Sequence, residues 1–159
     1  MLPTRPLDSD LDPPLLGAAE EAAALDEALV RPSVLLADDS EIVREALGQI
    51  LLASGYDVEA VSDGGAAIRV LKTQRVDALL LDLQMPGHDG FETLAYVQEH
   101  RRGLPVILMS GLPADEIQDR MHALHSGELP PLFLKPCDYD QLLGVLDLML
   151  SGQLPTTLD

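Results

Sequence analysis

The chain has 159 residues, 47% of them hydrophobic, and its 27 acidic and 10 basic residues give a net charge of −17. Its length and hydrophobic content suit one domain with a substantial core. The charge argues against nucleic acid and anionic membranes as partners, because both bind surfaces rich in Lys and Arg. No apolar run reaches the roughly 18 residues of a transmembrane helix, no signal peptide is evident, and the lone Cys137 cannot form an internal disulfide. These features predict a cytoplasmic protein.

Residues 1–31 are predicted to be an acidic extension of the main domain. Residues 1–14 combine prolines with aspartates, which is typical of a flexible tail. Residues 15–30 are rich in Ala, Leu and Glu and predict a helix, which ends at Arg31-Pro32. Three roles stay open for this helix: it packs on the domain, pairs with its copy in a homodimer, or remains solvated.

From Val34 onward, short apolar runs alternate with helix-forming segments. The sequence predicts strands over 34–38, 56–61, 77–82, 105–109 and 132–135, and helices over about 40–54, 63–74, 89–100, 113–126 and 138–150. Polar side chains suited to N-capping stand at the helix starts, namely Ser40, Asp63 and Asp138. Asp89 and Glu92 have the spacing of a capping box.

Five strands alternating with five helices predict an α/β domain with a parallel sheet. We expect the flavodoxin-like (βα)5 doubly wound topology with strand order 2-1-3-4-5, in which strands 1 and 3 lie side by side. A ligand site in this topology lies at the carboxyl ends of those two strands. We assign residues 32–151 to this domain and residues 152–159 to a short C-terminal tail.

Charged residues end three of the apolar runs, each of which is predicted to be a fully buried strand. Asp38 and Asp39 follow the first run, Asp82 follows the second, and Lys135 follows the third. A buried charge is costly unless it is paired or bound to a metal. We therefore expect these four residues to share a polar site at one edge of the sheet.

The residue types at this edge suit phosphoryl transfer. Three carboxylates repel one another unless a proton or a cation intervenes, and Mg²⁺ suits such all-oxygen ligands. Lys135 adds a positive charge, and Ser110, just after a predicted strand, adds a hydroxyl. In phosphoryl transfer, the metal and the lysine neutralise phosphoryl oxygens and a carboxylate can be the nucleophile.

The same residues form a set of short motifs at the predicted strand ends. In chain order they are Asp38-Asp39, Asp82-Leu83-Gln84-Met85-Pro86-Gly87, Asp89-Gly90, Ser110-Gly111 and Lys135-Pro136. With this order and placement, the segment from about Val34 to Leu150 resembles the receiver domain of two-component response regulators, in particular the single-domain, CheY-like receivers.

The resemblance implies a role for each site residue. Asp82 would accept a phosphoryl group from a phosphohistidine of a histidine kinase or histidine phosphotransfer protein. Ser110 would hydrogen-bond the phosphoryl group, and Lys135 would pair with it. The protein would thus be a phosphoacceptor that assists its own phosphorylation and dephosphorylation, rather than an enzyme. The Lys135-Pro136 peptide bond would be cis, as is usual in this family.

The resemblance also implies a Mg²⁺ site. Asp39 would bind the ion directly and Asp38 directly or through water, with Asp82 and the backbone carbonyl of Gln84 as further ligands. The side chain of Gln84 would tune autodephosphorylation, because it stands where receivers control the access of the attacking water.

One position departs from the pattern of this family. Many receivers carry Tyr or Phe three residues before the lysine, and this aromatic side chain swings inward on activation. Here that residue is Leu132, while the neighbouring Phe133 points to the opposite face of the strand. The usual coupling from Ser110 to an aromatic side chain is therefore not expected.

Only about nine residues follow Leu150, so we expect no attached output domain. Signalling would then occur through contact with an unknown output protein or by passing the phosphate along a relay. Two alternatives remain: a receiver used only as a scaffold, and a metal-dependent phosphatase with an aspartyl nucleophile. Haloacid dehalogenase-type phosphatases need a second Asp two residues after the nucleophile, where this chain has Gln84.

Overall fold

The computed structural model describes residues 30–85, 90–124 and 129–152. The predicted tail and most of the predicted helix before residue 30 lie outside the described residues, as do the loop 86–89 with its predicted cap Asp89 and the segment 153–159. The chain divides into two units, Met1–Arg31 and Pro32–Asp159. The second unit contains every described strand and helix.

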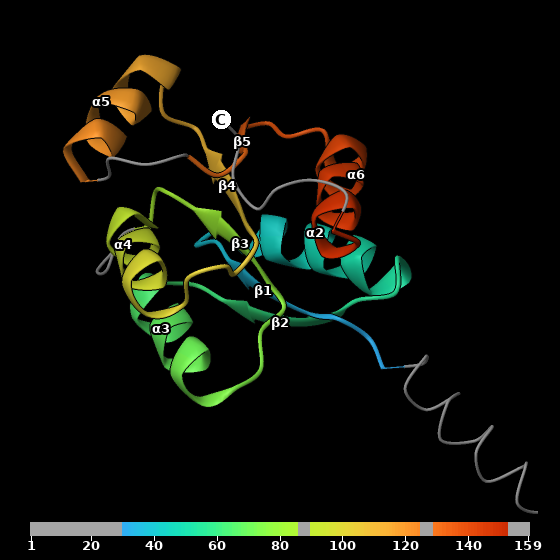
Figure 1. The fold of residues 1–159 in the computed structure, drawn as a ribbon. Helices are drawn as coiled ribbons and strands as arrows, with labels where there is room; N and C mark the ends of the chain where they lie inside the picture. Colours follow the sequence, from blue (N-terminus) through green and yellow to red (C-terminus); the bar gives the residue numbers. More distant parts are fainter. Residues whose placement is uncertain (1–29, 86–89, 125–128, 153–159) are drawn as a thin grey trace, which may run out of the picture. The chain divides into compact units, whose positions relative to one another are not determined.

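The described part of this unit is a parallel sheet of five strands alternating with five helices, as the sequence predicts (Figure 1). The strands are β1 (Ser33–Ala37), β2 (Asp57–Val61), β3 (Ala78–Asp82), β4 (Val106–Ser110) and β5 (Leu132–Leu134). The helices are α2 (Glu41–Ala53), α3 (Gly64–Thr73), α4 (Gly90–His100), α5 (Ala114–Leu124) and α6 (Tyr139–Leu150). The strand order β2-β1-β3-β4-β5 confirms the flavodoxin-like topology. None of the described helices is long and apolar enough to span a bilayer.

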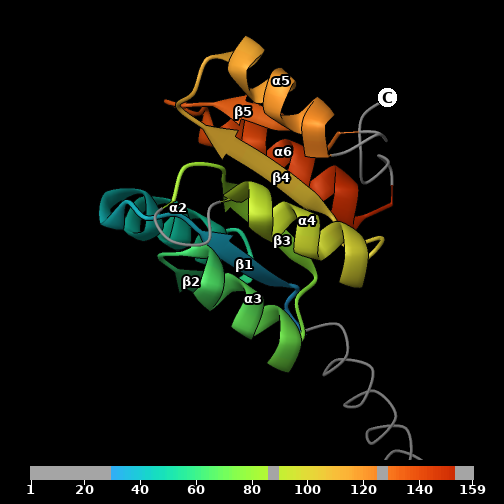
Figure 2. The same ribbon diagram turned by 90° about the vertical axis from the view of Figure 1, so that its left-hand side faces the viewer.

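Helices cover both faces of the sheet, with α3, α4 and α5 on one face and α2 and α6 on the other (Figures 1 and 2). Successive side chains of a strand point to opposite faces, so each strand supplies both layers. In β1, Leu35 and Ala37 pack toward α3, α4 and α5, whereas Val34 and Leu36 pack toward α2 and α6. The central strands β3 and β4 are buried along their whole length, which holds the strand ends that form the site in a rigid core.

Side-chain caps start three helices where the sequence predicts them. The Ser40 hydroxyl accepts a hydrogen bond from the backbone N–H of Val43, and the Asp63 carboxylate accepts one from Ala66. The carboxylate of Asp138 accepts bonds from two backbone N–H groups at the start of α6. Each cap satisfies N–H groups that have no partner within the helix. The cap at Ser40 turns the chain into α2 directly after the acidic pair.

The prediction that the run before Lys135 is a fully buried strand is wrong. Leu132 and Phe133 are only half-buried, and Leu134 is 48% exposed. The reason is that β5 lies at the edge of the sheet and pairs only with β4. The predicted opposite orientation of the first two side chains is confirmed, because Leu132 packs with the α3–α5 layer and Phe133 with the α2 and α6 layer.

Candidate functional site

The carboxyl ends of β1 and β3 bring the predicted acidic residues together. The two strands are neighbours with Ala37 in register with Leu81, so Asp38 and Asp82 leave the sheet side by side. Both are buried, whereas Asp39 is exposed. One carboxylate oxygen from each of the three lies within 4.8 Å of the others. The structure therefore gathers the acidic cluster that the sequence predicts.

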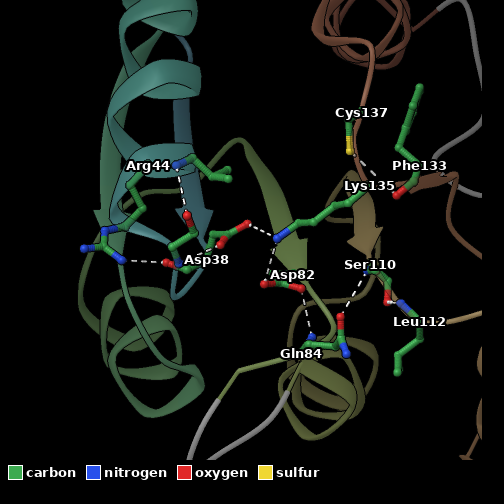
Figure 3. A network of polar contacts seen from close by, with 12 residues as sticks. Asp38, Arg44, Asp82, Gln84, Ser110, Leu112, Phe133, Lys135 and Cys137 are labelled. Atoms are coloured by element: carbon green, nitrogen blue, oxygen red, sulfur yellow. Dashed lines mark hydrogen bonds and ion pairs between the residues drawn. The ribbon is translucent and has the colours of Figure 1, made fainter.

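Lys135 reaches into this cluster from the loop after β5 (Figure 3). Its Nζ donates to Oδ2 of Asp38 at 2.7 Å and to Oδ2 of Asp82 at 3.1 Å. Its backbone N–H donates to the carbonyl of Ser110 at 2.8 Å, which ties the loop to the end of β4. The Lys135-Pro136 peptide bond is cis, as predicted. One ammonium thus lies between the two buried carboxylates.

The environment of Asp82 favours its neutral form. Burial is the main cause, and the charge of Asp38 adds to it, whereas the backbone N–H of Gln84 and the ammonium of Lys135 act in the opposite direction; the net effect raises the pKa of Asp82 to about 6. Burial by itself lowers the pKa of Lys135, but its bonds to the two carboxylates outweigh burial and raise that pKa. At neutral pH, Asp82 is thus an ionised carboxylate that a nearby cation would stabilise.

Arg44 holds the first acidic residue in place and was not foreseen from the sequence. Its guanidinium donates to the backbone carbonyl of Asp38 at 2.9 Å, and the carboxylate of Asp38 accepts a bond from the N–H of Ser40 at 2.8 Å (Figure 3). Arg44 occupies a half-buried position on α2. An arginine inside a predicted helix carries no signal that it will turn back to a strand end, so only the structure identifies this contact.

Gln84 and Ser110 lie on the other side of Asp82. The backbone N–H of Gln84 donates to Oδ1 of Asp82 at 2.9 Å, while its side-chain Oε1 accepts from the N–H of Gly111 at 3.1 Å. The hydroxyl of the buried Ser110 accepts from the N–H of Leu112 at 3.0 Å. Ser110 ends β4, the strand that pairs with β3 and its last residue Asp82. The contact between Gln84 and Gly111 was not predicted.

Gly90 allows α4 to start directly against the backbone of the site. A Cβ atom at this position would lie 2.3 Å from the carbonyl oxygen of Asp82 and 2.4 Å from Cα of Leu83. Real Cβ atoms do not approach other heavy atoms so closely, so the position requires glycine. The glycine of the Asp89-Gly90 motif is therefore required for steric reasons.

The chain matches the family model of the response regulator receiver domain over residues 34–147. It belongs to the receiver domain family of two-component response regulators. Receiver domains take part in phosphorylation-based signalling with histidine kinases or phosphotransfer proteins, and they are in general phosphoacceptors rather than enzymes.

Curated relatives and solved structures agree with this assignment. Protein-glutamate methylesterase/protein-glutamine glutaminase 1 of Anaeromyxobacter dehalogenans is 38% identical over 96 residues, which are 60% of this chain and 27% of that protein. Response regulator MprA of Mycobacterium avium is 32% identical over 125 residues, which are 77% of this chain and 52% of that protein. The signal receiver domain of an HD domain-containing protein from Pseudomonas fluorescens has a TM-score of 0.70 at 27% identity and covers 78% of this chain and 98% of that domain. The chain thus spans between a quarter and about half of the length of these curated relatives.

Receiver domains bind Mg²⁺ at an acidic pocket, and the donor set of this receiver suits that ion. Asp38, Asp39 and Asp82 offer oxygen ligands only, which hard divalent cations prefer. The single ammonium of Lys135 leaves the cluster of three carboxylates with excess negative charge. A cavity of about 380 Å³ is lined by Asp39 and Gln84, so the exposed carboxylate of the cluster opens to solvent.

Proposed function

We propose that this receiver accepts a phosphoryl group on Asp82 from the phosphohistidine of a histidine kinase or histidine phosphotransfer protein. The position of Lys135, whose ammonium lies 3.1 Å from a carboxylate oxygen of Asp82, is the observation that carries the proposal. Asp82 is the buried carboxylate that has both a cation and the acidic pair beside it. This combination suits a nucleophile whose product is a doubly charged phosphoryl group.

The transfer forms one bond and breaks one. A carboxylate oxygen of Asp82 attacks the phosphorus, the P–N bond of the phosphohistidine breaks, and its electron pair returns to the imidazole nitrogen. Lys135 then pairs with the phosphoryl oxygens instead of with the free carboxylate. The hydroxyl of Ser110 turns to donate a hydrogen bond to a phosphoryl oxygen. The barrier is lowered by positioning and charge neutralisation, as is general for phosphoryl transfer.

In this proposal Mg²⁺ is held by Asp39, by Asp38 directly or through water, and by Asp82 and the backbone carbonyl of Gln84. When bound, the ion supplies positive charge that neutralises phosphoryl oxygens. The arrangement of the chain supports this set, because the three carboxylates converge and Asp39 remains exposed to solvent.

Dephosphorylation removes the negative charge that the phosphoryl group added to Asp82. Water attacks the phosphorus, the bond between phosphorus and the Asp82 oxygen breaks, and inorganic phosphate leaves. The side chain of Gln84 is exposed beside Asp82, so we assign it control over the access of this water. The output partner is a protein that binds the phosphorylated and unphosphorylated receiver with different affinity. A second copy of this chain, in a homodimer, is one candidate for this partner.

The proposal is tested by incubating the protein with Mg²⁺ and acetyl phosphate and measuring its intact mass. We expect one phosphoryl group on the wild type and on Asp57→Asn, which changes an exposed carboxylate of β2, and none on Asp82→Asn or without Mg²⁺. An unlabelled wild type would leave the scaffold role as the better explanation. Continuous release of phosphate from p-nitrophenyl phosphate would instead support the aspartyl phosphatase.

A further inference from the structure

Arg44 connects the first turn of α2 to the end of β1 (Figure 3). It lies four residues after the N-cap Ser40, and its backbone N–H donates to the carbonyl of Ser40 at 3.0 Å. Long side chains of a helix point back toward its N-terminus, and the guanidinium accordingly reaches the backbone carbonyl of Asp38 at 2.9 Å. One residue of the helix thus holds the peptide between Asp38 and Asp39.

The other polar groups of Asp38 have partners from three segments. Its backbone N–H donates to the carbonyl of Val61, the last residue of β2, at 3.1 Å. Its Oδ1 accepts the N–H of Ser40, and its Oδ2 accepts the ammonium of Lys135. The carbonyl oxygen of this buried residue receives its donor from Arg44. A hydrogen bond from a guanidinium is roughly twice as strong as one between neutral groups, and a buried carbonyl without a donor is costly.

The carbonyl that Arg44 holds belongs to the peptide that leads into Asp39. A peptide unit is planar, so fixing the oxygen of Asp38 also fixes the backbone nitrogen of Asp39. Asp39 is exposed and lines the cavity at the site, and packing therefore does not immobilise its side chain. The direction of the Asp39 carboxylate thus depends on the peptide before it.

We propose that Arg44 is a positioning residue for the Mg²⁺ site, which holds the peptide before Asp39 so that the exposed carboxylate stays beside those of Asp38 and Asp82. One oxygen from each of the three carboxylates lies within 4.8 Å of the others. Mg²⁺ demands nearly octahedral geometry with ligands at about 2.1 Å, so a change in the direction of Asp39 weakens the site. The inference rests on the ligand set proposed above and does not depend on the phosphorylation of Asp82.

The charge of Arg44 by itself predicts the opposite effect on Mg²⁺ binding. Two cations repel each other, so removal of a guanidinium close to the acidic cluster would strengthen the binding of Mg²⁺. Loss of the hydrogen bond to Asp38 instead frees the peptide before Asp39 and weakens the binding. The sign of the change in affinity therefore separates the positioning role from a general electrostatic effect.

The positioning role is tested first without metal, by NMR relaxation of the backbone amides in EDTA. Arg44→Met keeps a long unbranched side chain and removes the donor, and Arg69→Met changes an exposed arginine of α3 as the matched control. We expect a lower order parameter for the amide of Asp39 in Arg44→Met, with wild-type values in β3, for example at Leu80. Arg69→Met should change neither. An unchanged order parameter at Asp39, or an equal decrease in β3, would overturn the proposal.

The affinity for Mg²⁺ is then measured by titration, with the amide resonances of the folded protein as the signal. We expect the Kd for Mg²⁺ to rise about tenfold in Arg44→Met, at the lower end of the usual cost of removing a group that orients a metal ligand. The Kd of Arg69→Met should equal that of the wild type. An unchanged or lower Kd in Arg44→Met would contradict the positioning role, because the arginine would then act through its charge or have no effect on the ion.

A double-mutant cycle tests whether Arg44 acts through Asp39. Asp39→Asn should itself raise the Kd for Mg²⁺, and Arg44→Met should add little in this background, because the carboxylate that it positions is absent. An equally large effect of Arg44→Met in both backgrounds would mean that the arginine acts on another part of the site, and would overturn the proposal.

The same measurements separate the positioning role from the proposed function. If Asp39→Asn leaves the Kd for Mg²⁺ unchanged, the proposed ligand set is wrong and the positioning role fails with it. If the wild type binds Mg²⁺ through Asp39 but acetyl phosphate does not label Asp82, the proposed function fails. The role of Arg44 is then still decided by the order parameter of Asp39 and by the Kd of Arg44→Met.

Discussion

The ammonium of Lys135 lies 3.1 Å from Oδ2 of Asp82, although the two residues are 53 positions apart in the sequence. The same ammonium lies 2.7 Å from Oδ2 of Asp38. One cation therefore serves two buried carboxylates, and its side chain is 26% exposed. The stability of the domain therefore depends on the charges of Lys135, Asp38 and Asp82, which are also the charges of the proposed phosphorylation site.

Replacement of the lysine should make the domain depend on Mg²⁺. In Lys135→Met, Asp38 and Asp82 lose their cation while they remain buried, so we expect the free energy of unfolding in EDTA to fall by about 1–3 kcal/mol. Mg²⁺ should stabilise this variant more than the wild type, because the ion replaces the missing charge. Urea unfolding with EDTA and with Mg²⁺ measures both effects, and Lys72→Met on the exposed surface of α3 is the control. An equal effect of Mg²⁺ on variant and wild type would contradict the shared role of Lys135.

Asp82 should reduce the stability of the metal-free domain at neutral pH. Burial raises its pKa to about 6, above the value of about 4 in an unfolded chain, so the folded state binds the extra proton between these values. The stabilising contribution is thus complete below about pH 4 and is lost as the pH rises to about 6. Asp82→Asn carries no such titration and leaves Lys135 paired with Asp38.

In EDTA, the stability of Asp82→Asn relative to the wild type should therefore increase as the pH rises. Above pH 6 the difference in the free energy of unfolding should be at most about 3 kcal/mol, because one pKa unit corresponds to about 1.4 kcal/mol. Thermal unfolding of both proteins between pH 4 and pH 8 gives this difference directly. If the difference in thermal stability between Asp82→Asn and the wild type stays constant from pH 4 to pH 8, the site does not disfavour the ionised form of Asp82.

Two glycine-to-alanine substitutions should have opposite effects. Gly90→Ala places a Cβ at 2.3 Å from a backbone oxygen of Asp82, so α4 must shift, and we expect a loss of at least about 2 kcal/mol. Gly144→Ala lies in the middle of α6 with no atom within 4 Å of the added Cβ, so it should stabilise by about 0.5–1 kcal/mol. Urea unfolding compares the two. A tolerated Gly90→Ala would mean that α4 does not need its close contact with the site.

Tyr56 and Asp147 should stabilise the domain as a pair. The buried hydroxyl of Tyr56, after α2, donates to the carboxylate of Asp147 on α6, and burial together with this carboxylate raises the pKa of the tyrosine. We expect Tyr56→Phe to lower the free energy of unfolding by about 1–2 kcal/mol. A double-mutant cycle with Asp147→Asn isolates the pair; a coupling energy near zero would contradict the bond.

The sequence sufficed to predict the topology and the gathering of the acidic cluster, because both follow from local patterns. Apolar runs that end in a charge marked the strand ends, and in a parallel sheet those ends meet at one edge. Caps such as Ser40 and Asp63 act within one turn of helix, so their partners are fixed by spacing alone. The burial of β5 was predicted wrongly, since an apolar run does not reveal whether its strand lies at an edge.

Hydrogen bonds between a side chain and the backbone of another segment were not predictable. The contact of Gln84 with Gly111 depends on the path of a loop, and the contact of Arg44 with Asp38 depends on the direction of a helix side chain. The spacing of residue types in the sequence does not predict either. The requirement for Gly90 is similar, because it arises from the backbone of another segment.

The central claim is that Asp82 carries the phosphoryl group, and chemical trapping tests it most directly. Protein treated with Mg²⁺ and acetyl phosphate is reduced with borohydride, which converts an aspartyl phosphate to homoserine, and the peptides are read by mass spectrometry. We predict the conversion at position 82 alone. Conversion at Asp38 or Asp39, or at no aspartate in protein that is otherwise folded, would contradict the account.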